Sequence, residues 1–294
     1  MKEFCGVRFF YRIPLIGRCY SDMISFRRLL QLSSLILSLY VLYLLQNQYF
    51  FESFLNSSYI SFNDFPPSYA GALNNSVLNN SKLEFDYSIF SENNSTSSYS
   101  SKIPRIIHFI WFKNLYDSHD RPSDIPSSGS DTPDLCRTYN PDFKINIWNA
   151  TAAHDFFQAE YAWFLPTYDA YVHPIQRVDA LKYFLLWHYG GVYMDLDISC
   201  RRALDPLLVF PAWFPRASPL GVNNDLMASV PRHPVVGKMT AGLQSRNRSL
   251  IFPYLTIFWS TGPKFASDML NAWFREHILE TSDRRASERR DVGK

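Results

Sequence analysis

Apolar and polar positions divide the chain into an uncharged amino-terminal stretch, a polar segment and a patterned carboxy-terminal part. No charged residue occurs from Leu29 to Phe51, and leucine dominates positions 29–45. An α-helix needs about 20 apolar residues to cross the hydrocarbon core of a bilayer. Basic residues precede this stretch and no small-residue cleavage site follows it. We therefore expect an uncleaved signal anchor at 29–50, with a cytosolic tail at 1–28.

The polar segment, residues 51–102, is rich in serine and asparagine and poor in basic residues. A segment of this composition cannot bury a core, so we expect an extended, disordered and glycosylated stem in the lumen of the secretory pathway. The chain contains these N-glycosylation sequons, most of them in the stem: Asn56, Asn74, Asn79, Asn93, Asn94, Asn149 and Asn247.

The remaining part alternates between short apolar runs and helical patterns. Arg105–Phe112 is apolar, β-branched and aromatic, which predicts a strand buried on both faces of a parallel sheet. The turn residues 140–142 lead into a second predicted strand, Phe143–Trp148. Thr151 follows the second of these strands and is positioned to cap a helix. Strands that alternate with helices predict an α/β domain, with ligands at the carboxyl ends of the strands. This domain should cover residues 103–280 and leave 281–294 as a charged, disordered tail.

A helix, a glycine stop, a strand and an acid pair follow one another between Arg177 and Asp197. Apolar residues recur with helical spacing in the first half of this stretch. Gly190 and Gly191 end the helix, because glycine adopts the left-handed conformation without strain. Polar residues on the opposite side of the helix fall three and four positions apart, so that their side chains are neighbours: Asp179, Lys182 and Tyr183.

The strand after the glycines delivers two carboxylates at its end. Side chains alternate along a strand, so we expect Asp195 and Asp197 on the same side. Two such acids repel unless a cation lies between them, and a hard divalent ion shared with substrate phosphates is the natural candidate. A pair of solvated turn aspartates is the alternative. A calcium hand loop is excluded, because Ile198 and Ser199 stand where acids and glycine would be required.

This frame resembles the donor-sugar site of GT-A glycosyltransferases, in particular glycosyltransferase family 32. Ile103–Trp111 agrees with the opening of that family. His173–Arg177 and Asn224–Met227 further resemble its branch of fungal inositol-phosphoceramide mannosyltransferases. The resemblance runs from about Ile103 to Leu270, and it implies a GT-A fold with a Rossmann-like mixed sheet.

The resemblance also implies roles for individual residues. Asp195 and Asp197 would hold a Mn²⁺ or Mg²⁺ that bridges the donor diphosphate. Asp179 and Lys182 would bind sugar hydroxyls and phosphate, with an exposed ion pair of about 0.3 kcal/mol as the alternative. Trp111 would stack on the nucleotide base, with an ordinary core aromatic as the alternative. The same comparison assigns four loop residues to the donor site: Asn224, Asp225, Thr261 and Gly262.

The implied activity is metal-dependent, retaining transfer of mannose from GDP-mannose to inositol phosphoceramide in sphingolipid synthesis. The resemblance implies a single-pass type II protein of the Golgi or endoplasmic reticulum membrane. It also implies that a membrane-embedded regulatory subunit is a possible partner. Mannose transfer to protein-linked glycans and a non-catalytic partner of an active paralogue are the alternatives. The net charge of +2 gives no argument for nucleic acid.

Two departures from the family bear on activity. The family normally has arginine at the position of Lys182, and lysine cannot form the bidentate fork of arginine. The chain also stops at Lys294, before a Ser-Trp-His segment that helps to complete the metal site in relatives.

Four further expectations are local. Cys5 and Cys19 precede the span and should be reduced, whereas Cys136 and Cys200 follow it and can pair. His108 is expected to be a hydrogen-bonded core residue. The aromatic cluster Trp213-Phe214-Pro215 either meets lipid at the surface or packs as a loop, and residues 113–134 should form a long polar loop.

Overall fold

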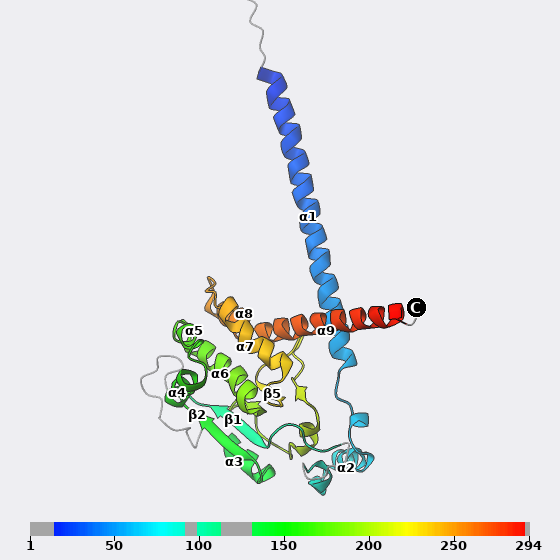
Figure 1. The fold of residues 1–294 in the computed structure, drawn as a ribbon, viewed down its shortest axis with the longest axis vertical. Coiled ribbons are helices and arrows are strands. Elements are labelled where there is room, and N and C mark those ends of the chain that lie inside the picture. The colour runs from blue at the N-terminus through cyan, green and yellow to red at the C-terminus, as the bar shows by residue number, and fades with distance from the viewer. Residues whose placement is uncertain (1–14, 92–98, 113–130, 292–294) are drawn as a thin grey trace, which may run out of the picture. The chain divides into compact units, whose positions relative to one another are not determined.

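The computed structural model describes residues 15–91, 99–112 and 131–291 (Figure 1). The chain divides into two compact units, Met1–Asn56 and Ser57–Lys294. The predictions for Cys5, Asn93, Asn94 and the loop residues 113–130 lie outside the described residues, as does the side chain of Cys19.

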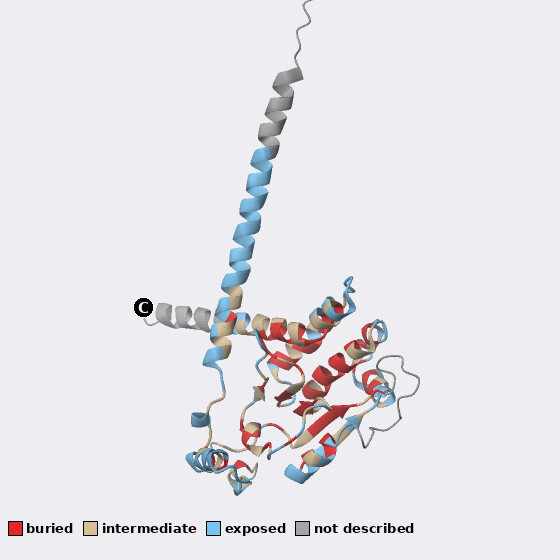
Figure 2. Ribbon diagram, turned by 180° about the vertical axis from the view of Figure 1, so that it is seen from behind, coloured by how far each residue is buried: buried red, intermediate tan, exposed pale blue. Residues whose placement is uncertain are grey.

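In the first unit the structure describes helix α1 (Leu15–Ser57), whose last residue belongs to the second unit. Within it, Arg27–Ser57 is long and apolar enough to cross a membrane, with a mean hydropathy of 1.7 and none of the most apolar window buried. Its leucine side chains are exposed along the whole predicted span (Figure 2). The structure thus confirms a single uninterrupted helix here, and its use as a membrane anchor stays a prediction.

The second unit is built on a five-stranded sheet in the order β2-β1-β3-β5-β4. Strand β1 runs parallel to β2 and β3, whereas β5 is antiparallel to β3 and β4 is antiparallel to β5. This mixed sheet confirms the expected α/β class, and it brings the carboxyl ends of β1 and β3 to one edge. The strands are β1 (Ile106–Ile110), β2 (Lys144–Trp148), β3 (Gly191–Met194), β4 (Ala212–Trp213) and β5 (Leu226–Ser229).

Helix α6 is the central helix of this unit. It contacts β1, β3 and β5 on the sheet and packs against α5, α7 and α8 (Figure 1). Buried residues concentrate in α6, α7 and the strands β1, β3 and β5, whereas the edge strand β2 is intermediate to exposed (Figure 2). The helices after β1 are α3 (Thr132–Tyr139), α4 (Ala150–Glu160), α5 (Leu165–Asp169), α6 (Pro174–Tyr189), α7 (Pro234–Arg246), α8 (Pro253–Ser260) and α9 (Pro263–Asp291).

Of two local predictions in the sheet region, the one for His108 is confirmed and the one for Thr151 is wrong. His108 is fully buried as expected, and its Nε2 lies 3.0 Å from the Gly190 carbonyl while its Nδ1 accepts from Trp148 Nε1 at 3.2 Å. Burial lowers its pKa to about 4, so the ring is neutral. The cap of α4 is Asn149 rather than Thr151, because the Asn149 side chain accepts from the Ala152 amide.

The segment expected to be a disordered stem is partly folded, and that prediction is wrong for most of residues 51–90, of which 51–57 belong to α1. It forms η1 (Phe62–Asp64), α2 (Pro67–Leu78) and η2 (Tyr87–Phe90). Tyr69 and Phe90 are buried together with Val209 of η3 (Asp205–Val209), and their rings meet edge to face at 5.6 Å. Aromatic residues scattered among the serines and asparagines supply enough apolar surface for this small core.

Two other boundaries also differ from the sequence prediction. Helix α9 continues through Asp291, so residues 281–291 are helical rather than disordered, in agreement with their helix-favouring alanine, glutamate and arginine. Trp213 is only 9% exposed, and its Nε1 donates to the Leu207 carbonyl at 3.0 Å. Of the two alternatives for the Trp213 cluster, the packed loop is therefore correct for the tryptophan.

Candidate functional site

The glycine pair after α6 brings β3 directly beside β1. Gly190 and Gly191 have φ of +66° and +92°, a region that L side chains rarely adopt. A Cβ on Gly191 would lie 2.6 Å from the Ile106 carbonyl oxygen. Glycine is therefore required both to end the helix, as predicted, and to let β3 pair with β1.

The acid pair lies on a turn and not on the strand. Strand β3 ends at Met194, and the Ile198 amide donates to the Asp195 carbonyl at 3.1 Å. Strand alternation therefore does not orient the two acids, which corrects that step of the sequence argument. The Asp195 amide donates to the Asp225 carbonyl at 2.8 Å, so the loop before β5 fixes the start of the turn. Asp195 is half-buried and Asp197 is exposed.

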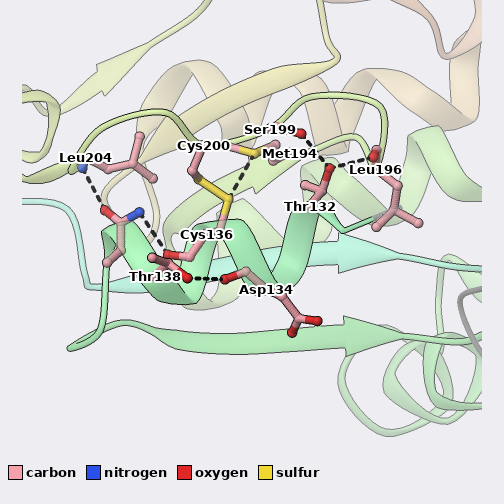
Figure 3. The surroundings of a disulfide bond; sticks show 10 residues. Thr132, Asp134, Cys136, Thr138, Met194, Leu196, Ser199, Cys200 and Leu204 are labelled. Atoms are coloured by element: carbon pink, nitrogen blue, oxygen red, sulfur yellow. Dashed lines mark hydrogen bonds between the residues drawn. A yellow bond between two sulfur atoms is a disulfide. The ribbon is translucent and has the colours of Figure 1, made fainter. Parts of the chain in front are cut away.

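A disulfide joins this turn region to helix α3. Cys136 of α3 is bonded to Cys200, and both residues are buried (Figure 3). The predicted pairing is thus confirmed. The bond closes a long loop that contains β2, α6 and β3. A disulfide that closes a long loop restricts the unfolded chain more strongly than one that closes a short loop.

Hydrogen bonds from α3 flank the disulfide on both sides (Figure 3). The Thr132 hydroxyl donates to the Leu196 carbonyl at 2.9 Å and lies 3.0 Å from the Ser199 hydroxyl. At the other end of the helix, Asn140 Oδ1 accepts from the Leu204 amide at 2.7 Å. Leu196 is the residue between the two aspartates, so α3 holds the backbone of the acid turn itself.

A buried polar cluster lies beside the acid turn. Lys182 Nζ is 3.0 Å from Asp179 Oδ1, and both side chains are almost fully buried. Asn224 Nδ2 donates to Asp179 Oδ1 at 3.1 Å, and the Thr261 hydroxyl donates to Asp179 Oδ2 at 3.0 Å. The Tyr183 hydroxyl donates to the Thr261 carbonyl at 2.7 Å. These contacts overturn the exposed ion pair as the alternative for Asp179 and Lys182.

Lys182 connects the buried cluster to the acid turn. Its Nζ lies 3.4 Å from Asp195 Oδ1 and donates to the Asn224 carbonyl at 3.2 Å. It also lies 4.8 Å from the centre of the Tyr193 ring, a cation–π contact. The ammonium group is therefore directed at internal acceptors.

The charges of the site leave an excess of negative charge. Burial raises the pKa of Asp179 and outweighs the opposing effect of Lys182. Burial acts to lower the pKa of Lys182, but Asp179 and Asp195 outweigh it and raise that pKa above its ordinary value. Burial and then the charge of Asp195 raise the pKa of Asp225. One ammonium group thus faces several carboxylates, an arrangement that favours a further cation.

The carboxylates fit a divalent ion only if a ligand shares it. Among the described residues, no group of three or more His, Cys, Asp or Glu side chains is arranged to hold a metal ion. Asp195 and Asp197 could supply two carboxylate ligands, and the remaining oxygens would have to come from a bound molecule or water. Mg²⁺ is commonly bound in this way, through one or two carboxylates and substrate phosphates.

Two tyrosines at the site were missed by the sequence analysis. The Tyr193 hydroxyl donates to Asp195 Oδ1, and burial together with the Asp195 charge raises the Tyr193 pKa, so it stays protonated. Alternation two positions before Asp195 could have revealed it. The buried Tyr171 hydroxyl has no hydrogen-bond partner among the described residues, and burial followed by the charge of Asp179 raises its pKa. No local pattern points to Tyr171.

The remaining predicted residues lie around this cluster. Trp111 follows β1 at the same sheet edge and is half-buried. Asp225 Oδ2 accepts from Asn223 Nδ2 at 2.5 Å. Gly262 joins α8 to α9, and its amide donates to the Ile257 carbonyl at 2.9 Å. The structure therefore brings Asp179, Lys182, Asn224 and Thr261 into direct contact, whereas Gly262 contributes through its backbone.

Known proteins resemble this part of the chain. Residues 126–212 match the family model described as "Glycosyltransferase sugar-binding region containing DXD motif". The chain is 46% identical over 176 residues to mannosyl phosphorylinositol ceramide synthase SUR1 of Saccharomyces cerevisiae, which covers 60% of this chain and 44% of the relative. It is 38% identical over 177 residues to inositol phosphoceramide mannosyltransferase 3 of Schizosaccharomyces pombe, which covers 60% of this chain and 47% of the relative.

The chain spans about half the length of the curated relatives it matches. Among solved structures, PaToxG glycosyltransferase aligns with a TM-score of 0.44 and 16% identity over 63% of this chain and 76% of that chain. A DXD region of this kind generally implies the use of a divalent metal. Residues 126–212, which contain α6, β3 and the Asp195-Leu196-Asp197 turn, thus match the model of glycosyltransferase sugar-binding regions that contain a DXD motif.

Proposed function

We propose that this protein is a retaining mannosyltransferase that moves mannose from GDP-mannose to inositol phosphoceramide. One observation carries the proposal: α6, the loop before β5 and the end of α8 converge on the acid turn at the carboxyl edge of the sheet. Ligands of open α/β sheets bind at this edge. The choice of sugar and acceptor is supported by the names of the two fungal relatives.

The acid turn would bind the diphosphate end of the donor. Asp195 and Asp197 would hold a Mn²⁺ or Mg²⁺, which would neutralise the charge that develops on the leaving nucleotide diphosphate. Lys182 keeps Asp195 close to Asp179 despite their like charges, because its ammonium group contacts both. Trp111 follows the adjacent strand at the same edge, and there it would stack on the nucleotide base.

The buried cluster would bind the sugar end of the donor. Asp179 is held by Asn224 and Thr261, so its carboxylate cannot rotate freely. The Asp179 carboxylate would accept from one sugar hydroxyl, and the buried Tyr171 hydroxyl, which has no hydrogen-bond partner among the described residues, would donate to another. Leaving that hydroxyl unsatisfied costs about 1–3 kcal/mol, which a bound sugar would recover.

The Cys136–Cys200 disulfide supports a lumenal location for this domain. Disulfides persist in the oxidising secretory pathway and are rare in the cytosol. Together with the apolar helix α1, it supports a type II protein of the Golgi or endoplasmic reticulum membrane. Protease treatment of sealed microsomes should leave the domain intact. Digestion without detergent would contradict this orientation.

The function is tested with the full chain in mild detergent, GDP-mannose, inositol phosphoceramide and Mn²⁺. We expect a mannosylated lipid with retained α configuration, and loss of turnover when the metal is chelated. UDP-glucose and a protein-linked glycan serve as the competing donor and acceptor. Transfer to the protein-linked glycan alone would instead support a mannosyltransferase that acts on protein-linked glycans.

A non-catalytic role predicts a different outcome of the same assay. The chain alone would bind GDP-mannose without turnover, and co-expression with an active relative would raise that relative's activity. A protein that binds neither the nucleotide nor the metal would contradict the proposed site altogether.

A further inference from the structure

A second surface of the carboxy-terminal unit exposes large apolar side chains. These side chains belong to the segment from Leu250 through α8, in which Ile251 is 92% exposed, Phe252 63%, Tyr254 72% and Trp259 44%. A run of this kind is unusual on a protein surface and marks an interaction site. Helix α8 lies at one end of the unit, and α2 and α3 lie at the other (Figure 1).

The segment is folded, and its apolar side chains are held outward. The Thr256 side chain is buried, and its hydroxyl accepts from the Leu250 amide at 2.8 Å and lies 3.2 Å from the Leu250 and Phe252 carbonyls. The rings of Tyr254 and Phe258 stack with centres 5.8 Å apart. Exposure of Ile251 and Phe252 is thus a property of an ordered turn, coloured as exposed in Figure 2.

The composition of the segment matches a lipid surface better than a protein partner. Residues 247–262 contain no acidic residue, and the exposed Arg248 stands just before the apolar run. Tyrosine and tryptophan with aliphatic residues are typical of segments at the boundary between headgroups and acyl chains. Arginine beside them favours anionic headgroups.

The same segment leads directly into the candidate site. Helix α8 ends at Ser260, whose hydroxyl accepts from Gln176 Nε2 at 2.7 Å. The next residue, Thr261, donates to Asp179 Oδ2. A membrane bound to one end of α8 would therefore lie about one short helix away from the buried cluster at its other end.

We propose that residues 250–259 form a membrane-docking element that inserts Ile251 and Phe252 into a bilayer surface with anionic headgroups. Docking would let the headgroup of an acceptor lipid reach the site while its acyl chains stay in the bilayer. The docking rests on the surface alone, whereas this use of it rests on the proposed lipid acceptor. A tether such as α1 would raise the local concentration of the element at the membrane.

The insertion is tested by a fluorescent label on the full chain in vesicles. Ile251→Cys receives an NBD group after Cys5 and Cys19 are changed to serine, while Cys136 and Cys200 stay disulfide-bonded. The matched control is Val77→Cys on α2, which is also exposed (60%) but lies at the opposite end of the unit. The vesicles contain phosphatidylcholine with or without phosphatidylserine. A parallel sample of the protein is treated with a glycosidase, which removes any glycan at Asn247.

We expect doxyl-labelled lipid to quench the label at residue 251 and iodide to quench the label at residue 77. Phosphatidylserine should strengthen the quenching at residue 251. Iodide quenching at both positions would overturn the proposal. A label at residue 251 that is shielded from both quenchers would also overturn it, because a protein partner, a second copy or another segment of a longer chain would then cover the surface.

The functional consequence is measured separately. Ile251→Ser with Phe252→Ser should lower the rate on an acceptor embedded in vesicles by roughly tenfold or more, since each large side chain contributes about this factor when it enters an apolar phase. The rate on a detergent-solubilised acceptor and the binding of GDP-mannose should not change. Val77→Ser with Leu78→Ser should alter neither rate. Equal loss on both acceptor forms would contradict the docking role, and loss of GDP-mannose binding in the unmutated chain would contradict the proposed function instead.

Discussion

Asp179 and Asp195 contact the same lysine but lie in different surroundings. The Asp179 side chain is 6% exposed and the Asp195 side chain is 34% exposed. Both oxygens of Asp179 accept hydrogen bonds from neighbouring side chains, Asn224 and Thr261. The side-chain contacts that the structure gives Asp195, from Lys182 and Tyr193, all fall on Oδ1.

This difference separates two tasks within one site. A carboxylate buried like Asp179 needs every partner that it has, because an unpaired buried charge is very costly. A half-exposed carboxylate like Asp195 keeps one side towards solvent, where an ion and a diphosphate can approach. The buried side should therefore govern stability and sugar recognition, and the exposed turn should govern the metal.

Asp179→Ala should have the largest effect on stability. It leaves the Lys182 ammonium group buried beside a cavity, and removing one partner of a buried ion pair costs about 3–5 kcal/mol. Chemical denaturation of the variant should show this loss relative to the unmutated protein. A loss below about 1 kcal/mol would mean that the pair is solvated.

The control for Asp179→Ala removes both charges together. Asp179→Asn with Lys182→Met keeps the volume and eliminates the unpaired ammonium group, so stability should return close to that of the unmutated chain. Transfer should still be abolished if the Asp179 carboxylate binds the sugar. A stable and fully active double variant would assign the pair to folding alone.

Tyr171→Phe should weaken donor binding without loss of stability. The change removes only a buried hydroxyl that has no partner among the described residues, so folding should be unaffected or slightly favoured. Affinity for GDP-mannose should fall by roughly five- to tenfold, about 1 kcal/mol, while affinity for GDP stays the same. Calorimetric titration with both ligands decides, and equal affinities in the two proteins would exclude a sugar contact.

Thr132→Val should have the smallest effect, and it should fall on the metal. The variant loses the hydrogen bond to the Leu196 carbonyl between the two aspartates, a loss of about 1 kcal/mol. The Mn²⁺ concentration for half-maximal turnover should rise by roughly fivefold, whereas Thr132→Ser should restore it. If serine and valine behave alike, α3 does not position the acid turn through this hydroxyl.

Much of the fold follows from local sequence patterns. The sequence pattern predicted β1, β2, α6 and β3 to within a few residues, because β1 and β3 are short apolar runs, β2 follows a turn signal and α6 has helical apolar spacing with a glycine stop. The cysteine pairing followed from the expected oxidising compartment and from the presence of only two cysteines after the apolar stretch. The acid pair was found for the same local reason, although its backbone is a turn.

The parts that sequence could not predict depend on long-range contacts. Asn224 and Thr261 reach Asp179 across 45 and 82 residues, and only a family resemblance pointed to them. The aromatic core of the expected stem needs Val209, which lies far along the chain. The exposure of the apolar run at Ile251 could not be predicted either, because periodicity does not distinguish a buried from an exposed apolar surface.

The measurement that tests the central claim most directly is mannose transfer by Asp195→Asn across a Mn²⁺ titration. The account predicts a stable protein with a rate loss of roughly a hundredfold or more, about 3 kcal/mol, because the metal is held less firmly on the side of the leaving diphosphate. High Mn²⁺ should recover part of the rate, and Asp197→Asn should behave alike. Normal turnover of the Asp195 variant at low Mn²⁺ would contradict the assignment of the metal to this turn.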